Sequence, residues 1–259
     1  TAQASGTVIR RGQTIIARDV PGVNVSERMP GTTDVFAYLH LSTITDWSEV
    51  ESRYRTLLGD RLRPSPSLAR HARRLIGAEE APRAIVERLY HAVVDRIRYV
   101  GLEFGIHSFQ PSPADETWAR GYGDCKDKAV LLIAMLRSVG VNAQFVLVRT
   151  RPEGSIPSQP ASLAFFDHAM VFLPELQRFI DPTVDQNAPW TLPSPDEGAQ
   201  VLVIGEGGQL RTVERRPPED HLVDLDLRMT VDRTGLGTGA VRWALRGAPA
   251  LPTRRALEP

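Results

Sequence analysis

The longest apolar run in the chain predicts a helix that is buried on nearly all sides. Residues 129–136 are all apolar. Asp124 before this run is a favourable N-cap, Asp127 occupies the third position of the first turn, and Gly140 is a common residue just past a helix end. We therefore expect a core helix that begins at Cys125 and stops at Gly140.

Shorter patterns predict three more helices and a series of short strands. Helices are expected over residues 46–59, 67–76 and 82–97. Strands are expected at 7–10, 14–17, 35–39, 142–150, 168–172, 177–181 and 201–204, of which 142–150 has the apolar pattern of a strand buried on both faces. Residues 100–119, 151–161 and 184–200 are expected to be irregular, and 211–220 to be a linker. We expect the helices to pack around the helix that begins at Cys125.

Apolar and polar side chains alternate in residues 223–231, and residues 241–245 repeat the pattern after a turn at 232–235. Such alternation predicts a hairpin with one buried face. We interpret this hairpin as the start of another β unit.

Composition excludes several classes of partner. The 31 basic and 31 acidic residues balance, and no long basic run occurs, so neither nucleic acid nor an anionic membrane is expected to bind. The apolar helix is far short of the roughly 20 residues that span a bilayer, and no signal peptide opens the sequence. Thr1 stands in place of an initiator Met, which suggests a mature form or an excised fragment. The single cysteine excludes a disulfide framework and a multi-cysteine zinc site.

Cys125 is the first candidate for chemistry because it lies in the first turn of the predicted helix. Unpaired backbone N–H groups and the positive end of the helix dipole favour an anion there, and the thiolate is the nucleophilic form of cysteine. The alternative is inert packing, since cysteine is often buried and Cys125 lies in line with the core stripe. Residues further along the chain favour the reactive interpretation.

His168 and Asp181 are predicted to face each other across a hairpin. If residues 173–176 form the turn, residue 172 pairs with 177 and, counting back, His168 pairs with Asp181. Opposed Cβ atoms lie about 4.5 to 5.5 Å apart, close enough for a carboxylate to hold an imidazole. Taken singly, an ordinary core histidine and a turn-capping aspartate explain these residues at least as well. With Cys125 they complete the nucleophile, base and orienting group of nucleophilic catalysis.

Three motifs, at 122–129 (YGDCKDKA), 167–171 (DHAMV) and 179–183 (FIDPT), resemble the transglutaminase-like branch of the papain-type cysteine enzymes. The similarity covers about residues 80–205. It implies an α+β fold in which the cysteine helix packs on an antiparallel sheet that bears the histidine and the aspartate. It also implies that Cys125 is the nucleophile, His168 the general base and acid, and Asp181 the orienting residue.

The resemblance also divides the chain. It makes residues 61–208 the transglutaminase-like catalytic domain and 209–259 the start of a C-terminal β unit. Residues 1–60, and 41–47 (LSTITDW) in particular, are similar to the end of the uncharacterised β domain that precedes this module in many exported bacterial proteins. We therefore expect export to the periplasm or cell surface of a bacterium.

The implied chemistry is acyl transfer from a peptide or protein through a thioester on Cys125, without a cofactor or metal. The expected oxyanion donors are the Cys125 backbone N–H and the side chain of Gln110, which we prefer to Trp118; a loop-capping role is an equally good interpretation of Gln110. Lys126 and Lys128 are expected to face solvent. We expect a cysteine peptidase or amidase. The alternatives are a transglutaminase, in which an amine replaces water, and a non-catalytic peptide-binding module.

Overall fold

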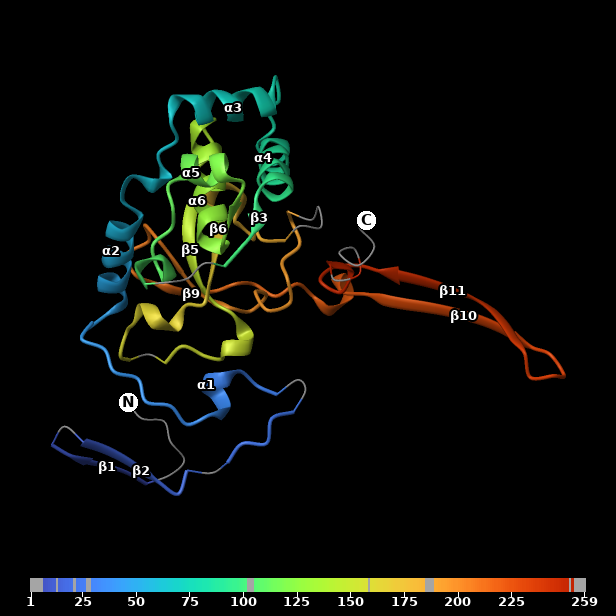
Figure 1. Cartoon of the computed structure of the whole chain (residues 1–259), viewed down its shortest axis with the longest axis horizontal. Coiled ribbons are helices and arrows are strands. Elements are labelled where there is room, and N and C mark those ends of the chain that lie inside the picture. Colours follow the sequence, from blue (N-terminus) through green and yellow to red (C-terminus); the bar gives the residue numbers. More distant parts are fainter. Residues whose placement is uncertain are drawn as a thin grey trace.

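In the computed structural model, a layer of helices packs against an antiparallel sheet, and a separate hairpin lies near each end of the sequence (Figure 1). The structure describes residues 7–12, 14–20, 22–26, 29–101, 105–157, 159–184, 189–251 and 253. The α-helices are α1 (Thr32–Val35), α2 (Trp47–Leu58), α3 (Pro66–Ile76), α4 (Pro82–Arg96), α5 (Ala114–Arg120) and α6 (Cys125–Ser138). The strands are β1 (Thr7–Arg11), β2 (Thr14–Arg18), β3 (Arg98–Tyr99), β4 (Tyr122–Gly123), β5 (Gln144–Arg149), β6 (His168–Leu173), β7 (Arg178–Ile180), β8 (Gln200–Val203), β9 (Leu210–Thr212), β10 (Val223–Val231) and β11 (Gly237–Leu245).

Helix α6 is the central element, and it begins where its local sequence predicts. The Asp124 carboxylate accepts the Asp127 N–H at 3.2 Å, and the Asp127 carboxylate accepts the Asp124 N–H at 3.4 Å, which completes a capping box. Beyond the other end of α6, Gly140 adopts a positive φ of 87°. All residues from Cys125 to Leu136 are buried, so the predicted core helix is confirmed.

The main sheet has five strands in the order β7-β6-β5-β8-β9, and every neighbouring pair is antiparallel. Phe145 and Leu147 of β5 pack in the core shared with α6, while Val146 and Val148 pack in a second core on the opposite face. Strand β5 is therefore buried on both faces, as predicted. The expected α+β arrangement, with the cysteine-bearing helix on an antiparallel sheet, is confirmed.

The predicted helices do pack around α6. Tyr54 of α2, Leu68 of α3 and Leu89 of α4 all belong to the core that contains α6. Helix α5 also contacts α6, although residues 100–119 were expected to be irregular. Because α5 has only seven residues, its stability depends on this packing rather than on its own sequence. The domain boundaries near residues 60 and 208 stay predictions.

Two other expectations about secondary structure are wrong. Residues 35–39 do not form a strand: α1 ends at Val35, and the segment bears only an isolated bridge at Tyr38. Helix α1, just before it, contacts a distant loop, where Thr33 Oγ1 donates to the Glu153 carbonyl at 3.0 Å. The expected linker at 211–220 begins with strand β9, which pairs with β8.

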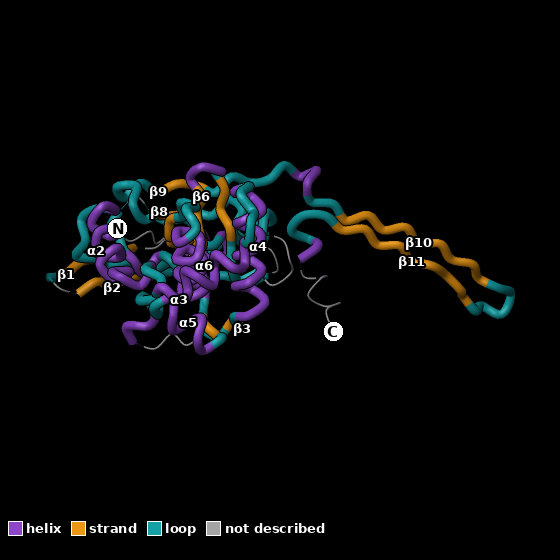
Figure 2. The backbone as a smooth tube through the Cα atoms, turned by 90° about the horizontal axis from the view of Figure 1, so that it is seen from above, coloured by secondary structure: helices purple, strands orange, loops and turns teal. Residues whose placement is uncertain are grey.

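The hairpin β10–β11 has the predicted strands and turn but no buried face. It extends away from the remainder of the chain (Figure 2). Leu225, Leu227 and Trp243 are each about 60% exposed, at 59%, 59% and 61%. The alternating pattern therefore predicted the strands correctly. The expected burial of one face of the hairpin is wrong for the residues that the structure describes. None of the described helices has the length and apolar character required to cross a membrane; export stays a prediction.

Candidate active site

Cys125 lies at the start of α6 and opens onto a cavity of about 260 Å³. The thiol-bearing residue is 6% exposed. Tyr54, Phe166 and His168 line the same cavity. The N-terminal turn of α6 therefore presents the sulfur to a partly enclosed space, next to backbone N–H groups that have no acceptor within the helix.

Two ion pairs and a backbone hydrogen bond hold this turn in place. Asp127 accepts hydrogen bonds from Arg120 Nη2 at 2.5 Å and from the Ser112 N–H at 2.7 Å. Lys126 donates to the Asp124 carboxylate, and both side chains are buried. The prediction that Lys126 and Lys128 face solvent is wrong: these residues are 5% and 0% exposed. Other elements surround α6, so Lys128 is enclosed in the core, while Lys126 borders the cavity of Cys125 and a neighbouring pocket.

The hairpin that carries the histidine and the aspartate has a different register from the predicted one. Leu173 pairs with Arg178, and Val171 pairs with Ile180. The loop still has four residues, but it covers 174–177, because Pro174–Leu176 form a 3₁₀ turn and Gln177 adopts a positive φ of 50°. Moving a loop of constant length by one residue shifts the pairing by two. Side chains alternate with a period of two, so the shift keeps every residue on its predicted face.

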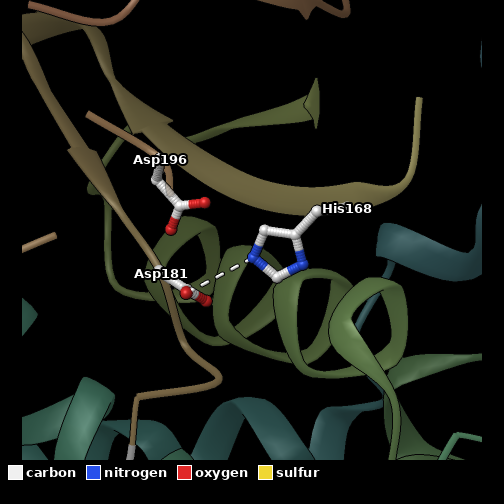
Figure 3. Close-up of side chains that lie close together, drawn as sticks. All are labelled: His168, Asp181 and Asp196. Carbon is white, nitrogen blue, oxygen red and sulfur yellow. Dashed lines mark ion pairs between the residues drawn. The ribbon is translucent and has the colours of Figure 1, made fainter. Parts of the chain in front are cut away.

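His168 and Asp181 therefore still meet, as diagonal rather than direct neighbours. His168 Nε2 lies 3.3 Å from Asp181 Oδ2, and the other ring nitrogen points away from Asp181 (Figure 3). The Thr183 backbone N–H and hydroxyl donate to Asp181 Oδ1 at 2.8 and 2.7 Å. At the start of β6, the Asp167 carboxylate binds the Thr150 N–H at 2.8 Å and so joins β6 to the end of β5. Hydrogen bonds made at the ends of β6 and β7 therefore hold both members of the pair in place.

The pKa values of His168 and Asp181 depend on each other and on the groups around them. Burial alone would lower the pKa of His168, but the charge of Asp181 and hydrogen bonds with Asp181 and Cys125 raise this pKa well above its usual value. Burial alone would raise the pKa of Asp181, but the imidazolium and the hydrogen bonds from His168 and Thr183 lower it. The structure thus brings Cys125, His168 and Asp181 together and favours the charged forms of the histidine and the aspartate.

Two neighbours of this site were not identified from the sequence. Tyr54, from α2, lines the cavity of Cys125 and is 1% exposed. Asp196 lies beside Asp181, and the nearest polar atoms of His168, Asp181 and Asp196 are within 4.8 Å of one another (Figure 3). Tyr54 follows the pattern of a core helix residue, and Asp196 lies in a Pro-rich loop, so neither position carried a signal of proximity to Cys125.

The structure does not bring Gln110 or Trp118 to the cavity of Cys125. Gln110 lines a neighbouring pocket with Asp124 and Lys126, and its amide donates to the Leu57 carbonyl at 3.4 Å. The Trp118 ring packs on His71 and against the Arg96 guanidinium. The geometry therefore offers no support for either side chain as an oxyanion donor.

A family match and one solved structure agree with this architecture. Residues 69–175 match the transglutaminase-like superfamily. Among solved structures, a "putative protease" from Parabacteroides distasonis has a TM-score of 0.65 and 12% identity over 83% of this chain. A "putative cysteine protease" from Cytophaga hutchinsonii covers 72% of this chain at 16% identity and a TM-score of 0.35.

The chain spans 42% and 56% of the length of these two proteins, respectively. No curated protein matches it. At 12% identity, the likeness to the Parabacteroides protein shows a common fold and nothing further. The match over residues 69–175, on the fold described above, shows that this chain contains a transglutaminase-like domain.

Proposed function

We propose that this chain is a cysteine enzyme that transfers acyl groups, acting as a peptidase or amidase on a peptide or protein. The observation that carries the proposal is the pair formed by the half-buried His168 and the buried Asp181, in which His168 is also hydrogen-bonded to a cysteine at a helix start that opens onto a cavity. The raised pKa of His168 favours an imidazolium beside Cys125, and a positive neighbour favours the nucleophilic form of a cysteine.

The reaction proceeds in two halves. The Cys125 thiolate attacks a carboxamide carbonyl, a C–S bond forms, and the carbonyl electron pair moves to oxygen. The tetrahedral intermediate collapses, the C–N bond breaks, and the His168 imidazolium gives its proton to the departing amine. His168 then removes a proton from water, which attacks the thioester. The C–S bond breaks, the carboxylic acid leaves, and the thiolate–imidazolium pair is restored.

The negative oxygen of the intermediate requires donors. The backbone N–H of Cys125 is the first, because groups in the opening turn of a helix lack intrahelical acceptors. As the side-chain donor we propose Tyr54 in place of Gln110. Burial, together with the charge of Cys125, raises the pKa of the Tyr54 hydroxyl, which keeps its proton on the oxygen.

The direct test is the rate of Cys125 alkylation by iodoacetamide between pH 5 and 10, in the wild type and in His168→Ala. His71→Ala, on α3 outside the cavity, serves as the matched control. Near pH 6 an ordinary thiol is less than about 1% ionised, so we expect the wild type and the control to react at least about 10-fold faster than His168→Ala. An ordinary thiol profile that is identical in all three proteins would refute the proposal in favour of a binding module.

The same proteins test hydrolysis against transamidation. Labelled casein serves as a general protein substrate and dansylcadaverine as the amine, with Cys125→Ser as the inactive control. We expect casein cleavage that Cys125→Ser abolishes. Incorporation of the amine into intact casein would instead assign a transglutaminase, because the two reactions share the thioester and differ only in the group that attacks it.

A further inference from the structure

Asp196 is a second buried carboxyl group beside the one that orients His168. It is 2% exposed, and both carboxyl groups lie on the same side of the His168 ring (Figure 3). Its position is set by the backbone of its loop, since the Asp196 N–H donates to the Pro193 carbonyl and the Ala199 N–H donates to the Asp196 carbonyl, each at 3.0 Å. The preceding Pro195 carbonyl accepts the Arg151 N–H at 2.9 Å. The loop backbone is therefore fixed at Asp196, and the side-chain oxygen lies within 4.8 Å of the nearest polar atoms of Asp181 and His168.

The two carboxyl groups have very different hydrogen-bond partners. Asp181 accepts three hydrogen bonds or ion-pair contacts, two from Thr183 and one from His168. Within the part of the chain that the structure describes, Asp196 Oδ2 is buried and no N–H or hydroxyl group donates to it. Because an ionised carboxylate can only accept hydrogen bonds, the group with donors is the one that carries the charge. The proton of this pair therefore belongs to Asp196.

The charges around Asp196 agree with this assignment. Burial contributes most to raising its pKa, and the negative charges of Asp181 and Asp167 add to the effect while His168 opposes it. The resulting pKa is about 7. In the adjacent Glu197, Oε2 lies 3.0 Å from His221 Nε2, while Oε1 is buried with no hydrogen-bond partner among the described residues.

We propose that Asp196 is a positioning residue of the Cys125–His168–Asp181 site: as a neutral carboxylic acid it donates its O–H to Asp181 and thereby holds the carboxylate that orients His168. This inference rests on the proposed function. It adds a fourth member to the site, acting through Asp181 without contact to the reacting atoms. Above neutral pH the proton leaves, the two carboxylates repel each other, and the orientation of His168 is lost in part.

A shared proton explains the cluster better than a metal ion does. The polar atoms of His168, Asp181 and Asp196 are close enough for one ion to bind all three. An ion bound at Nε2 would, however, have to replace the contact between His168 and Asp181, and both Asp181 oxygens are already engaged. A proton between the carboxyl groups leaves all of these contacts in place.

The test compares pH profiles of Cys125 alkylation by iodoacetamide in the wild type, Asp196→Asn and Asp196→Ala, each with and without EDTA. Asparagine keeps an N–H donor for Asp181 but cannot ionise. We expect Asp196→Asn to react within about 3-fold of the wild type at pH 6 and Asp196→Ala about 10-fold more slowly. Between pH 6 and 8 the wild-type rate, relative to that of Asp196→Asn, should fall at least 3-fold, with a midpoint near pH 7.

Three results would overturn the inference while leaving the proposed function intact. They are identical pH profiles in the wild type and Asp196→Asn, a wild-type rate in Asp196→Ala, and a wild-type profile that changes with EDTA, which would assign the cluster to a metal. If Asp196→Ala does not fold, as judged by near-ultraviolet circular dichroism, the comparison with Asp196→Asn decides alone. A wild-type rate that does not depend on His168 would overturn the proposed function and this inference together.

Discussion

Asp124 has two separable roles at the start of α6, and we expect variants that lack its carboxylate to lose much of the free energy of unfolding. Its carboxylate caps the helix by accepting the Asp127 N–H, and it is the counter-charge of the buried Lys126. Burial, followed by the charge of Asp127, raises the pKa of Asp124 despite the pairing with Lys126. The ion pair is therefore not itself a source of net stability. The cost of breaking it is the ammonium group that is left buried without a partner.

Asp124→Asn keeps the cap, since asparagine caps as well as aspartate, and removes only the charge. Breaking a buried pair in this way costs about 3 to 5 kcal/mol. Asp124→Ala removes the cap as well and should cost about 1 kcal/mol more. The total is a large fraction of the roughly 5 to 15 kcal/mol by which a domain is stable. Replacing both charges, in Asp124→Asn with Lys126→Met, should recover most of the loss.

The assay is urea unfolding followed by the fluorescence of the four tryptophans. For an m value of about 3 kcal/mol/M, the single variant Asp124→Asn should lower the midpoint by about 1 to 2 M. The double variant should lie within about 0.5 M of the wild type. If the urea midpoints of Asp124→Asn and Asp124→Ala both lie within about 0.3 M of the wild-type midpoint, the Lys126 ammonium does not need Asp124 as a counter-charge and the reasoning is refuted.

Three further predictions concern the surroundings of the site. Asp181→Asn should slow Cys125 alkylation at pH 6 at least 10-fold. It should also lower the free energy of unfolding more at pH 6 than at pH 10, because the raised pKa of His168 stabilises the fold fully below pH about 6.5, and this stabilisation is lost as the pH rises through the pKa of the folded state. Equal losses at both pH values would contradict the pairing of His168 with Asp181. Gly123→Ala would put a Cβ 2.7 Å from Asp127 Cβ, so we expect the free energy of unfolding in urea to fall by about 1 to 3 kcal/mol and Cys125 alkylation to slow. An unfolding midpoint equal to that of the wild type would show that the turn accommodates the methyl group. Tyr54→Ala should lower the free energy of unfolding by about 3 to 5 kcal/mol, whereas Tyr54→Phe should keep the fold and slow only casein cleavage, with alkylation unchanged. Equal cleavage by Tyr54→Phe and the wild type would show that the hydroxyl has no role in the reaction.

The sequence alone determined the features that depend on neighbouring residues. Helix α6 begins at Cys125 because Asp124 and Asp127 cap each other within one turn, and the apolar run behind them is buried whichever way it packs. The motifs around His168 and Asp181 identified the remaining two members of the candidate site. Alternation also fixed which face each side chain occupies, and this prediction survived an error of two residues in the register of the hairpin.

Features that depend on distant segments could not be predicted from the sequence. The register of β6 and β7 was set by the left-handed conformation of Gln177, which no apolar pattern encodes. Lys126 is buried because other elements surround α6, and Asp196 reaches Asp181 because its loop is held by Arg151. Local sequence fixes hydrogen bonds between residues a few positions apart, whereas the partner of a buried charge is decided by which parts of the chain the fold brings together.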